Sequence, residues 1–464
     1  MPPEIDRLPP APRRPSAGAS TELPEQALDE AVELLRALLR IDTTNPPPSG
    51  GGERPAAELC AVALEGAGIA VELLEQLPGR TNVVARLSGR DPAVPPLLLG
   101  AHLDVVPAGD GWRHPPFEAV IDDGFLYGRG AVDMKHFAAQ AVTALRWLKK
   151  LGVVPAQDVI FAGVADEEEG CGLGSAFLVE RHPEKVRAGV AFGEIGGFTL
   201  HLAGRRFYPI QIAERGIASL RLRARGEMAH ASVPPPETAV GRLARAVGRL
   251  DEAALPPHRS PPVERMLAAL CRGIGGPAGA MAWIGATPGL LRLLLSLTPD
   301  SGLRRSLLGL LSNGATATEL SGSGKRNVVP AEASAGLDGR ILPGQTIEGF
   351  LEEIRAVVGP GIEVQLERAA PPQVTRYPHP WFDRLAAAVK AVDPEGIPIP
   401  YAIPGFTDAG SWARLGTACF GFAPVVLPKG LDFPRLYHAV DERIPVDGFR
   451  AGLRMLWAAL TASD

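Results

Sequence analysis

Hydrophobic and polar positions follow two different periods in the first two hundred residues. Residues 97–99, 158–165 and 188–193 form short, almost continuously apolar runs, which are typical of strands buried on both faces of a parallel sheet. Residues 28–40 and 137–148 carry apolar positions at helical spacing. Strands that alternate with helices in this way predict an α/β fold, in which helices cover both faces of a parallel-rich sheet.

The pattern changes after Glu214. Residues 218–225 (ASLRLRAR) alternate between an apolar face and an arginine-rich face, which predicts a strand with one solvated face in an antiparallel sheet. A predicted helix over residues 238–250 follows, and a strand–helix–strand pattern fills residues 334–367. These segments predict a smaller α+β domain that is inserted into the larger one.

The length of 464 residues is too great for one ordinary core and favours two domains. We expect residues 25–214 and 372–464 to form the larger domain, and residues 215–371 to form the inserted one. Residues 1–24 contain prolines and charges but lack the apolar core of a signal peptide, so we expect a flexible arm. The Leu-rich segment 256–313 should add apolar helices, which either line a pocket for a long acyl chain or pack against protein.

Composition and charge argue against several classes of protein. The net charge of −5 gives no support to a nucleic-acid or anionic-membrane partner. No stretch approaches the roughly 18 apolar residues that a membrane span requires. The four cysteines are scattered without a C-x-x-C pair, which argues against a zinc ribbon or a disulfide framework and favours a reducing, cytoplasmic compartment.

Acidic residues and a histidine follow the apolar runs. His102 and Asp104 come after the first run, Glu167 and Glu168 after the second, and Glu194 after the third. Ligands of open α/β sheets bind at the carboxyl ends of the strands. In an extended chain the side chains of His102 and Asp104 point to the same side, so Asp104 can orient the imidazole while the imidazole binds a metal.

Asp133, in GRGAVDMK, and His438, in HAVDERIP, complete a candidate metal site. Two imidazoles and three carboxylates suit a pair of zinc-like ions with one bridging carboxylate. One of two adjacent acids can then bind metal while the other acts as general base on metal-bound water, whose pKa falls towards ~7. Considered separately, the same residues could be a buried histidine–aspartate pair and a solvated acidic loop.

These pieces resemble the M20 family of metallopeptidases and amidohydrolases, which includes carboxypeptidase S, aminoacylase-1, succinyl-diaminopimelate desuccinylase and acetylornithine deacetylase. Eight motifs stand in the family's order: GAHLDVVP, GRGAVDMK, ADEEEG, GEIGG, GEMAHASVP, NVVPAEASAGLDGRILPG, GFTD and HAVDERIP. The resemblance covers nearly the whole chain after residue 24. The Leu-rich insertion and the run at 324–327 are most similar to the carboxypeptidase S and N-fatty-acyl-amino-acid hydrolase branch.

The resemblance implies a role for each ligand. His102 and Glu194 would bind one metal, Glu168 and His438 would bind the other, and Asp133 would bridge the two. The implied cofactors are two Zn²⁺ ions, with Co²⁺ or Mn²⁺ as alternatives.

The resemblance also implies the catalytic groups. Glu167 would act first as general base and then as acid towards the leaving amine, while Asp104 would orient the first metal-binding histidine. A cis peptide bond is implied after Asp133. The substrate pocket would be lined by Gly405, Phe406 and Thr407.

The inserted domain corresponds by resemblance to a lid or dimerisation domain. In it, His230 would polarise the scissile carbonyl, reaching the metals by closure of the domain or from a second subunit. Asn327 and Arg340 would hold the substrate carboxylate or other polar groups. The alternatives are a helix-capping role for His230 and an ion pair with Asp338 for Arg340.

We therefore expect a homodimeric di-zinc hydrolase that uses metal-bound hydroxide to cleave an amide or peptide bond next to a free carboxylate. Its substrate would be a small molecule or short peptide. A narrow-specificity deacylase of the desuccinylase or deacetylase type is the alternative. A catalytically silent binding protein is disfavoured by the intact ligand set. Six other histidines lack motif context and are expected on the surface or in loops: His114, His136, His182, His201, His258 and His379.

Overall fold

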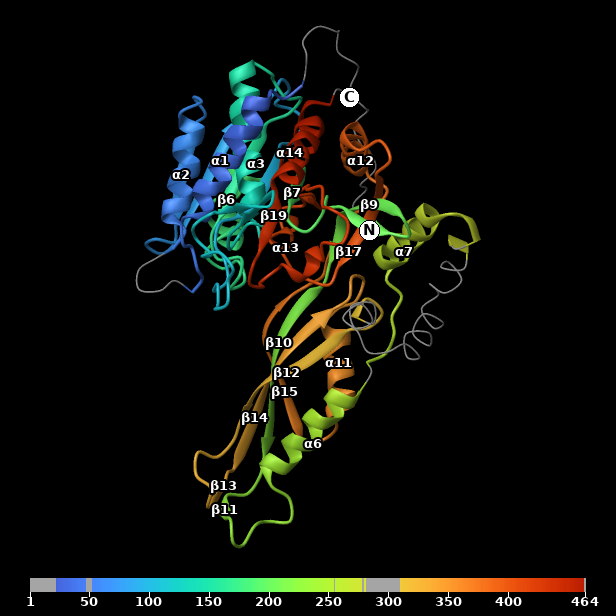
Figure 1. Ribbon diagram of the computed structural model, residues 1–464. Coiled ribbons are helices and arrows are strands. Elements are labelled where there is room, and N and C mark those ends of the chain that lie inside the picture. The colour runs from blue at the N-terminus through green and yellow to red at the C-terminus, as the bar shows by residue number, and fades with distance from the viewer. Residues whose placement is uncertain (1–21, 47–51, 254, 278, 281–308, 463–464) are drawn as a thin grey trace.

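The computed structural model describes residues 22–46, 52–253, 255–277, 279–280 and 309–462 (Figure 1). A ten-stranded sheet occupies the upper part of the molecule in this view. Along its main path the order is β1 (Val71–Glu75), β2 (Thr81–Leu87), β6 (Val159–Val164), β3 (Leu97–His102), β7 (Val190–Gly193), β18 (Ala418–Gly421), β9 (Arg205–Glu214) and β16 (Gln373–Val374). The remaining two, β17 (Ile397–Ile403) and β8 (Leu200–Leu202), both pair with β9.

The centre of this sheet, β6-β3-β7-β18, is parallel, whereas β1, β2 and most pairs around β9 are antiparallel. Alternate residues of β3 enter different hydrophobic clusters, because Leu97 and Leu99 belong to one and Leu98 to the other. Both faces of the strand are therefore covered, which explains its continuous apolar sequence.

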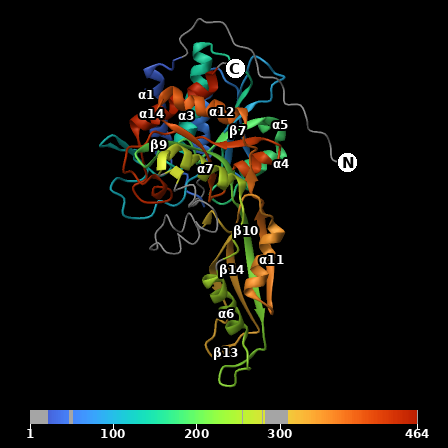
Figure 2. The same ribbon diagram turned by 90° about the vertical axis from the view of Figure 1, so that its right-hand side faces the viewer.

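Helices cover the two faces of the large sheet (Figure 2). The first face carries α1 (Glu25–Leu39), α2 (Arg54–Glu65), α3 (Lys135–Leu151), α12 (Pro380–Val392) and α14 (Val446–Thr461). The second face carries α4 (Ser175–Arg181), α5 (Pro183–Val186) and α13 (Ala409–Ala413). This arrangement confirms the predicted α/β class.

A four-stranded antiparallel sheet forms the elongated lower part of Figure 1. Its order is β12 (Gly314–Ser321), β14 (Glu332–Ile341), β10 (Gly216–Arg225) and β15 (Ile362–Ala370), and its core includes residues of α6 (Ala239–Glu252) and α11 (Ile347–Val358). Leu220 and Leu222 of β10 are buried in this core, while Arg221 on the other face pairs with acidic neighbours. The strict alternation of the sequence thus produces the predicted one-sided strand.

Smaller elements complete the described chain. β11 (Ala229–His230) and β13 (Val328–Val329) pair at the far tip of the lower part (Figure 1), and β19 (Arg443–Pro445), β5 (Phe125–Tyr127) and β4 (Ile121–Asp122) form a three-stranded sheet. The 3₁₀ helix η1 spans Phe433–Arg435. Among the described residues, no helix combines the length and hydrophobicity needed to cross a bilayer.

The Leu-rich segment begins with α7 (Pro261–Ile274), which packs against β17 and β9 of the large sheet. Val263 and Met266 of α7 share a buried cluster with Ala213 of β9 and Ala402 of β17. Protein packing thus accounts for this apolar helix. Residues 281–308, which contain the densest leucine run of the segment, lie outside the described residues.

Candidate metal centre

The five predicted ligands come from five separate segments. His102 ends β3, Glu194 directly follows β7, and Glu168 lies in the loop after β6. Asp133 stands two residues before α3, and His438 follows η1. Because β3, β6 and β7 are adjacent and parallel, their carboxyl ends bring three of these side chains to one edge of the sheet.

Asp133 lies between the two histidines. Its Oδ1 is 3.0 Å from His102 Nε2, and its Oδ2 is 3.1 Å from His438 Nε2. His438 Nε2 also lies 3.2 Å from Glu168 Oε2, and His102 Nε2 lies 3.8 Å from Glu194 Oε2. The aspartate thus offers one oxygen to each side, which is the arrangement required of a bridging carboxylate.

The electrostatics of the cluster show a concentration of buried charge. Burial raises the pKa of Glu194 to about 8, and burial also raises the pKa of Glu168. Hydrogen bonding to Asp133 and Glu168 raises the pKa of His438 to about 10. Burial opposes ionisation of Asp133, but its contacts with the two histidines hold the pKa of its carboxyl below the usual value.

The donor set fits divalent metal ions. Glu168 Oε1 and Glu194 Oε1 are buried and have no hydrogen-bond partner. Ligand atoms of His102, Asp133 and Glu168 lie within 4.8 Å of one another, as do those of His102, Glu167 and Glu194. Carboxylate and imidazole ligands of this kind suit zinc and similar ions. Metal ligation would satisfy the two unpartnered oxygens.

Glu167 belongs to the group with His102 and Glu194, so it faces the same space as the candidate ligands. The backbone N–H groups of Glu167 and Glu168 donate to the carboxylate of Asp104, at 3.2 and 3.1 Å. His102 Nδ1 lies 3.0 Å from the main-chain carbonyl of Asp104 and 3.6 Å from its carboxylate. Asp104 therefore holds both the imidazole and the acidic loop, and its main-chain oxygen is the closer partner of the imidazole.

Comparison with known proteins identifies the family of this site. The sequence profile of Peptidase family M20/M25/M40 matches residues 98–462. The chain belongs to the M20 family. This result confirms the resemblance that the eight motifs predicted.

Curated relatives and solved structures agree with this assignment. Human N-fatty-acyl-amino acid synthase/hydrolase PM20D1 is 30% identical over 397 residues, which cover 82% of this chain and 76% of the relative. Mouse aminoacylase-1 is 28% identical over 452 residues, covering 93% and 95% of the two chains. The crystal structure of an M20 family metallo-carboxypeptidase from Sulfolobus solfataricus shares the fold with a TM-score of 0.69 at 18% identity, over 93% of this chain and 99% of that one. This M20 protein is a metallohydrolase of the peptidase and amidohydrolase type.

A buried polar network behind the M20 site was missed by the sequence analysis. Asn45 Nδ2 donates to Asp104 Oδ2 at 2.9 Å and to Asp166 Oδ1 at 3.2 Å. Arg80 Nη2 donates to Asp166 Oδ1 at 3.0 Å, and Arg80 Nε donates to Glu53 Oε2 at 2.8 Å. The sequence signal for Asn45 was hidden, because its DTTNPPP context indicates only a turn.

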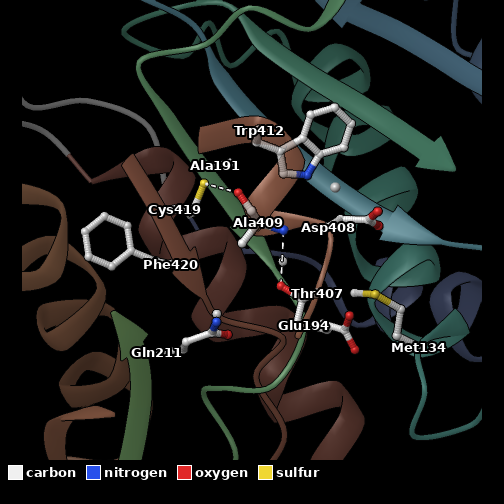
Figure 3. Close-up of a pocket in the computed structure, with 13 residues that line it drawn as sticks. Met134, Ala191, Glu194, Gln211, Thr407, Asp408, Ala409, Trp412, Cys419 and Phe420 are labelled. Carbon is white, nitrogen blue, oxygen red and sulfur yellow. Dashed lines mark hydrogen bonds between the residues drawn. The ribbon is translucent and has the colours of Figure 1, made fainter. Parts of the chain in front are cut away.

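Thr407 of the GFTD loop has a more internal position than the sequence analysis expected, whereas Gly405 and Phe406 are partly exposed. Thr407 is buried, its hydroxyl donates to Glu214 Oε2 at 2.6 Å, and its oxygen accepts from the backbone N–H of Ala409 at 3.1 Å. Thr407 lines a cavity of about 10 Å³ together with Glu194 and Asp408 (Figure 3). Burial raises the pKa of Glu214 to about 8 and that of Asp408 to about 6. The hydroxyl of Thr407 is thus already engaged with protein groups.

Two of the three predicted residues of the lower sheet, His230 and Asn327, lie at its far tip, whereas Arg340 lies at the end of β14 next to the upper sheet, where its main-chain oxygen accepts from Arg215 Nη2 at 3.1 Å. His230 ends β11 at the far tip (Figure 1), where it is exposed and its Nδ1 is 2.7 Å from Ser232 Oγ. Asn327 lies at the same tip, and its main-chain oxygen accepts from the N–H of Ala231 at 3.0 Å. Arg340 forms an ion pair with Asp338, with N–O distances of 2.7 and 3.0 Å.

Two alternative readings can now be compared with these contacts. The Asp338 ion pair, which the sequence analysis left open for Arg340, is present. The capping role for His230 is wrong, because Thr238 caps α6 by accepting from Gly241 N.

Two further expectations have clear outcomes. The Asp133–Met134 peptide bond is cis, which confirms the prediction. His136 was expected on the surface or in a loop, but it is buried within α3, and burial lowers its pKa to about 4. Its position in the first turn of a helix that is buried on most sides explains the error, because a motif-based interpretation does not assess packing around an isolated histidine.

Proposed function

We propose that this M20 protein is a di-metal hydrolase that cleaves an amide or peptide bond next to a free carboxylate. The observation that carries the proposal is the position of Asp133, with one oxygen directed to His102 and the other to His438. His102 and Glu194 would hold one ion, and Glu168 and His438 the other. When bound, the ions would supply Lewis acidity towards the scissile carbonyl and lower the pKa of water.

In this proposal Glu167 moves the proton. It would accept a proton from the attacking water and transfer it to the nitrogen of the leaving amine. Its backbone is held by Asp104, which also holds His102, so base and ligand keep a fixed relation. His230, Asn327 and Arg340 remain proposed substrate-binding groups. Of these, His230 and Asn327 require a different domain arrangement or a second subunit, because they lie at the far tip of the lower sheet.

The proposed substrates are N-acyl amino acids or short peptides. Human PM20D1 is named as an N-fatty-acyl-amino acid synthase/hydrolase and mouse aminoacylase-1 as an aminoacylase, and both align over most of this chain. We also propose zinc as the native metal, a homodimer and a cytoplasmic location. The unpaired state of Cys60, Cys171, Cys271 and Cys419 supports a reducing compartment.

A metal-reconstitution and substrate experiment tests the proposal. The purified chain is stripped with chelator, reloaded with Zn²⁺, Co²⁺ or Mn²⁺, and assayed on N-acetyl and N-long-chain-acyl amino acids and on dipeptides. Amides of the same amino acids without the free carboxylate are the matched controls. We expect two ions per chain and hydrolysis that requires both metal and the carboxylate. Full activity in the stripped chain, or equal activity on the carboxyl-blocked controls, would contradict the proposal.

A further inference from the structure

Glu442 is a completely buried carboxylate that the proposed mechanism does not use. Its exposed fraction is 0%, and its two oxygens accept four hydrogen bonds. Oε1 accepts from the backbone N–H groups of Val132 (2.6 Å) and Asp133 (3.1 Å). Oε2 accepts from the N–H of Gly130 (3.1 Å) and from Arg129 Nη1 (2.7 Å). Because each oxygen of Glu442 already accepts two hydrogen bonds, neither oxygen is available as a further metal ligand.

Arg129 extends the contact to another segment. Its side chain is also buried, and its Nη2 donates to the main-chain oxygens of Pro107 and Ala108, each at 3.3 Å. Its guanidinium lies 5.2 Å from the ring centroid of Trp112. These partners belong to the loop that leaves β3 just after His102.

The pair thus joins three segments, each of which carries a candidate metal ligand. Pro107 follows His102 by five residues, Asp133 itself donates its N–H to the carboxylate, and Glu442 follows His438 by four residues. Asp133 and Glu442 are 309 positions apart in sequence, so no local structure could hold them together. The bond to the N–H of Asp133 restrains the backbone from which the bridging side chain projects.

We propose that Glu442 and Arg129 form a positioning pair that sets Asp133 relative to His102 and His438 and so determines the metal affinity of the site. This inference rests on the proposed metal centre. Groups that hold metal ligands in place commonly change metal affinity or activity by 10–100-fold when they are removed. A contribution to folding stability alone explains the presence of this pair less well, because a buried ion pair often stabilises a fold no more than apolar side chains of similar volume would.

The test uses the metal-loaded protein and measures release of the ions to a chromophoric chelator. In Glu442→Gln the amide retains the shape of the side chain but directs an NH₂ group at one pair of donors. We expect 10–100-fold weaker metal binding and an altered visible spectrum of the Co²⁺ form. Arg129→Lys should give a smaller change in the same direction, because it keeps the charge but not the geometry.

Asp393→Asn is the matched control. Asp393, directly after α12, is a largely buried carboxylate that accepts from Arg206 at 2.7 Å and from Tyr208 at 2.9 Å, both on β9. Loss of this negative charge should leave the dissociation constants of the bound metal ions unchanged.

Three outcomes can be distinguished. A folded Glu442→Gln protein with wild-type metal constants and Co²⁺ spectrum would overturn the positioning role. If that variant does not fold, the same result in Arg129→Lys would overturn it. A wild-type chain that retains no divalent ion would refute the proposed function together with this inference.

Discussion

Adjacent acids at positions 167 and 168 occupy different surroundings. Both backbone N–H groups donate to Asp104, which fixes the direction of the loop. Asp166, immediately before them, has a left-handed backbone with φ of 65°, and its carboxylate is held by Arg80 and Asn45. Glu168 consequently reaches His438, whereas Glu167 faces His102 and Glu194. This division of environments is why we assign them different roles.

Substitution of these neighbours should separate catalysis from metal binding. Glu167→Ala should retain two ions but lose about 10²–10⁴-fold in turnover, because it removes the proton carrier. Glu168→Ala should instead lose one ion, as measured by elemental analysis after gel filtration. Glu169→Ala is the control, since its side chain is exposed. Near-normal turnover in metal-replete Glu167→Ala would assign the base to another residue.

The buried carboxyl of Glu214 predicts a pH dependence of stability. Burial raises its pKa to about 8 from an ordinary value of 4.5, so between these values the folded chain holds a proton that the unfolded chain releases. Stability should therefore fall as the pH rises through this window, by up to about 1.4 kcal/mol per pH unit from this group. Glu214→Gln, which cannot release a proton, should become more stable relative to wild type as the pH rises from 5 to 8.

Chemical denaturation of the chelator-treated proteins at several pH values measures this difference. Glu65→Gln, an exposed substitution at the end of α2, should show no such trend. A pH-independent difference between Glu214→Gln and wild type would show that Glu214 is ionised in the folded chain.

The sequence was informative about the site residues that follow buried strands. It was uninformative about the residues that hold those site residues in place by hydrogen bonds. The proposed ligands could be predicted because strand ends concentrate functional groups, and because GAHLDVVP and HAVDERIP are specific motifs. Arg80, Asn45 and Glu442 could not be assigned roles, since each acts through a hydrogen bond to a residue at least 59 positions away. No local pattern specifies such a partner.

At the scale of elements, periodicity was a good guide where one face of an element is solvated. The alternation of β10 corresponds to buried Leu220 and Leu222, and α6 begins at the Thr238 cap. Periodicity was less informative for the Leu-rich segment, because apolar positions look alike whether they bind a ligand or pack on protein. The burial of Met266 against the large sheet favours protein packing for α7.

Polar substitutions in residues 281–308 should distinguish these readings. Four leucines, Leu290, Leu291, Leu294 and Leu295, are replaced together by glutamine, and kcat/KM is measured on N-acetyl and N-long-chain-acyl derivatives of one amino acid. If the segment forms an apolar wall for the acyl chain, activity on the long-chain substrate should fall at least tenfold more than on the acetyl one. An equal loss on both substrates would favour protein packing.

On the scale of the whole molecule, the two sheets are linked by two short connections. Glu214–Gly216 joins β9 to β10, and Ala370–Gln373 joins β15 to β16. The backbone N–H of Arg215 donates to Gly405 O in the first connection, so the start of the lower sheet is tied to the GFTD loop. The sequence predicted the change of sheet type after Glu214, but it could not predict that His230 would lie at the opposite end of the lower sheet from this junction (Figure 1).

This position restricts how His230 can act in catalysis. A side chain reaches only a few ångströms, and His230 belongs to a two-residue strand at the far tip, beside Asn327. Rotation about the two connections would have to carry the whole length of the lower sheet back onto the upper one. A second copy of the chain could instead place its tip at the metal centre without any bending, in a two-fold dimer. We therefore favour donation from a second subunit.

Mixing two inactive variants tests this arrangement. His230→Ala lacks the proposed oxyanion donor, whose removal should cost roughly 10²–10³-fold in kcat, and Glu167→Ala lacks the proposed base. In a hybrid dimer that exchanges tips, one site would have both defects and the other would have an intact His230 and an intact Glu167. Mixtures incubated under subunit exchange should therefore recover part of the wild-type activity, whereas each variant mixed with itself should remain inactive. Hybrid dimers that form, as shown by differently tagged chains purifying together, but stay inactive would rule out the second-subunit route and leave closure within one chain.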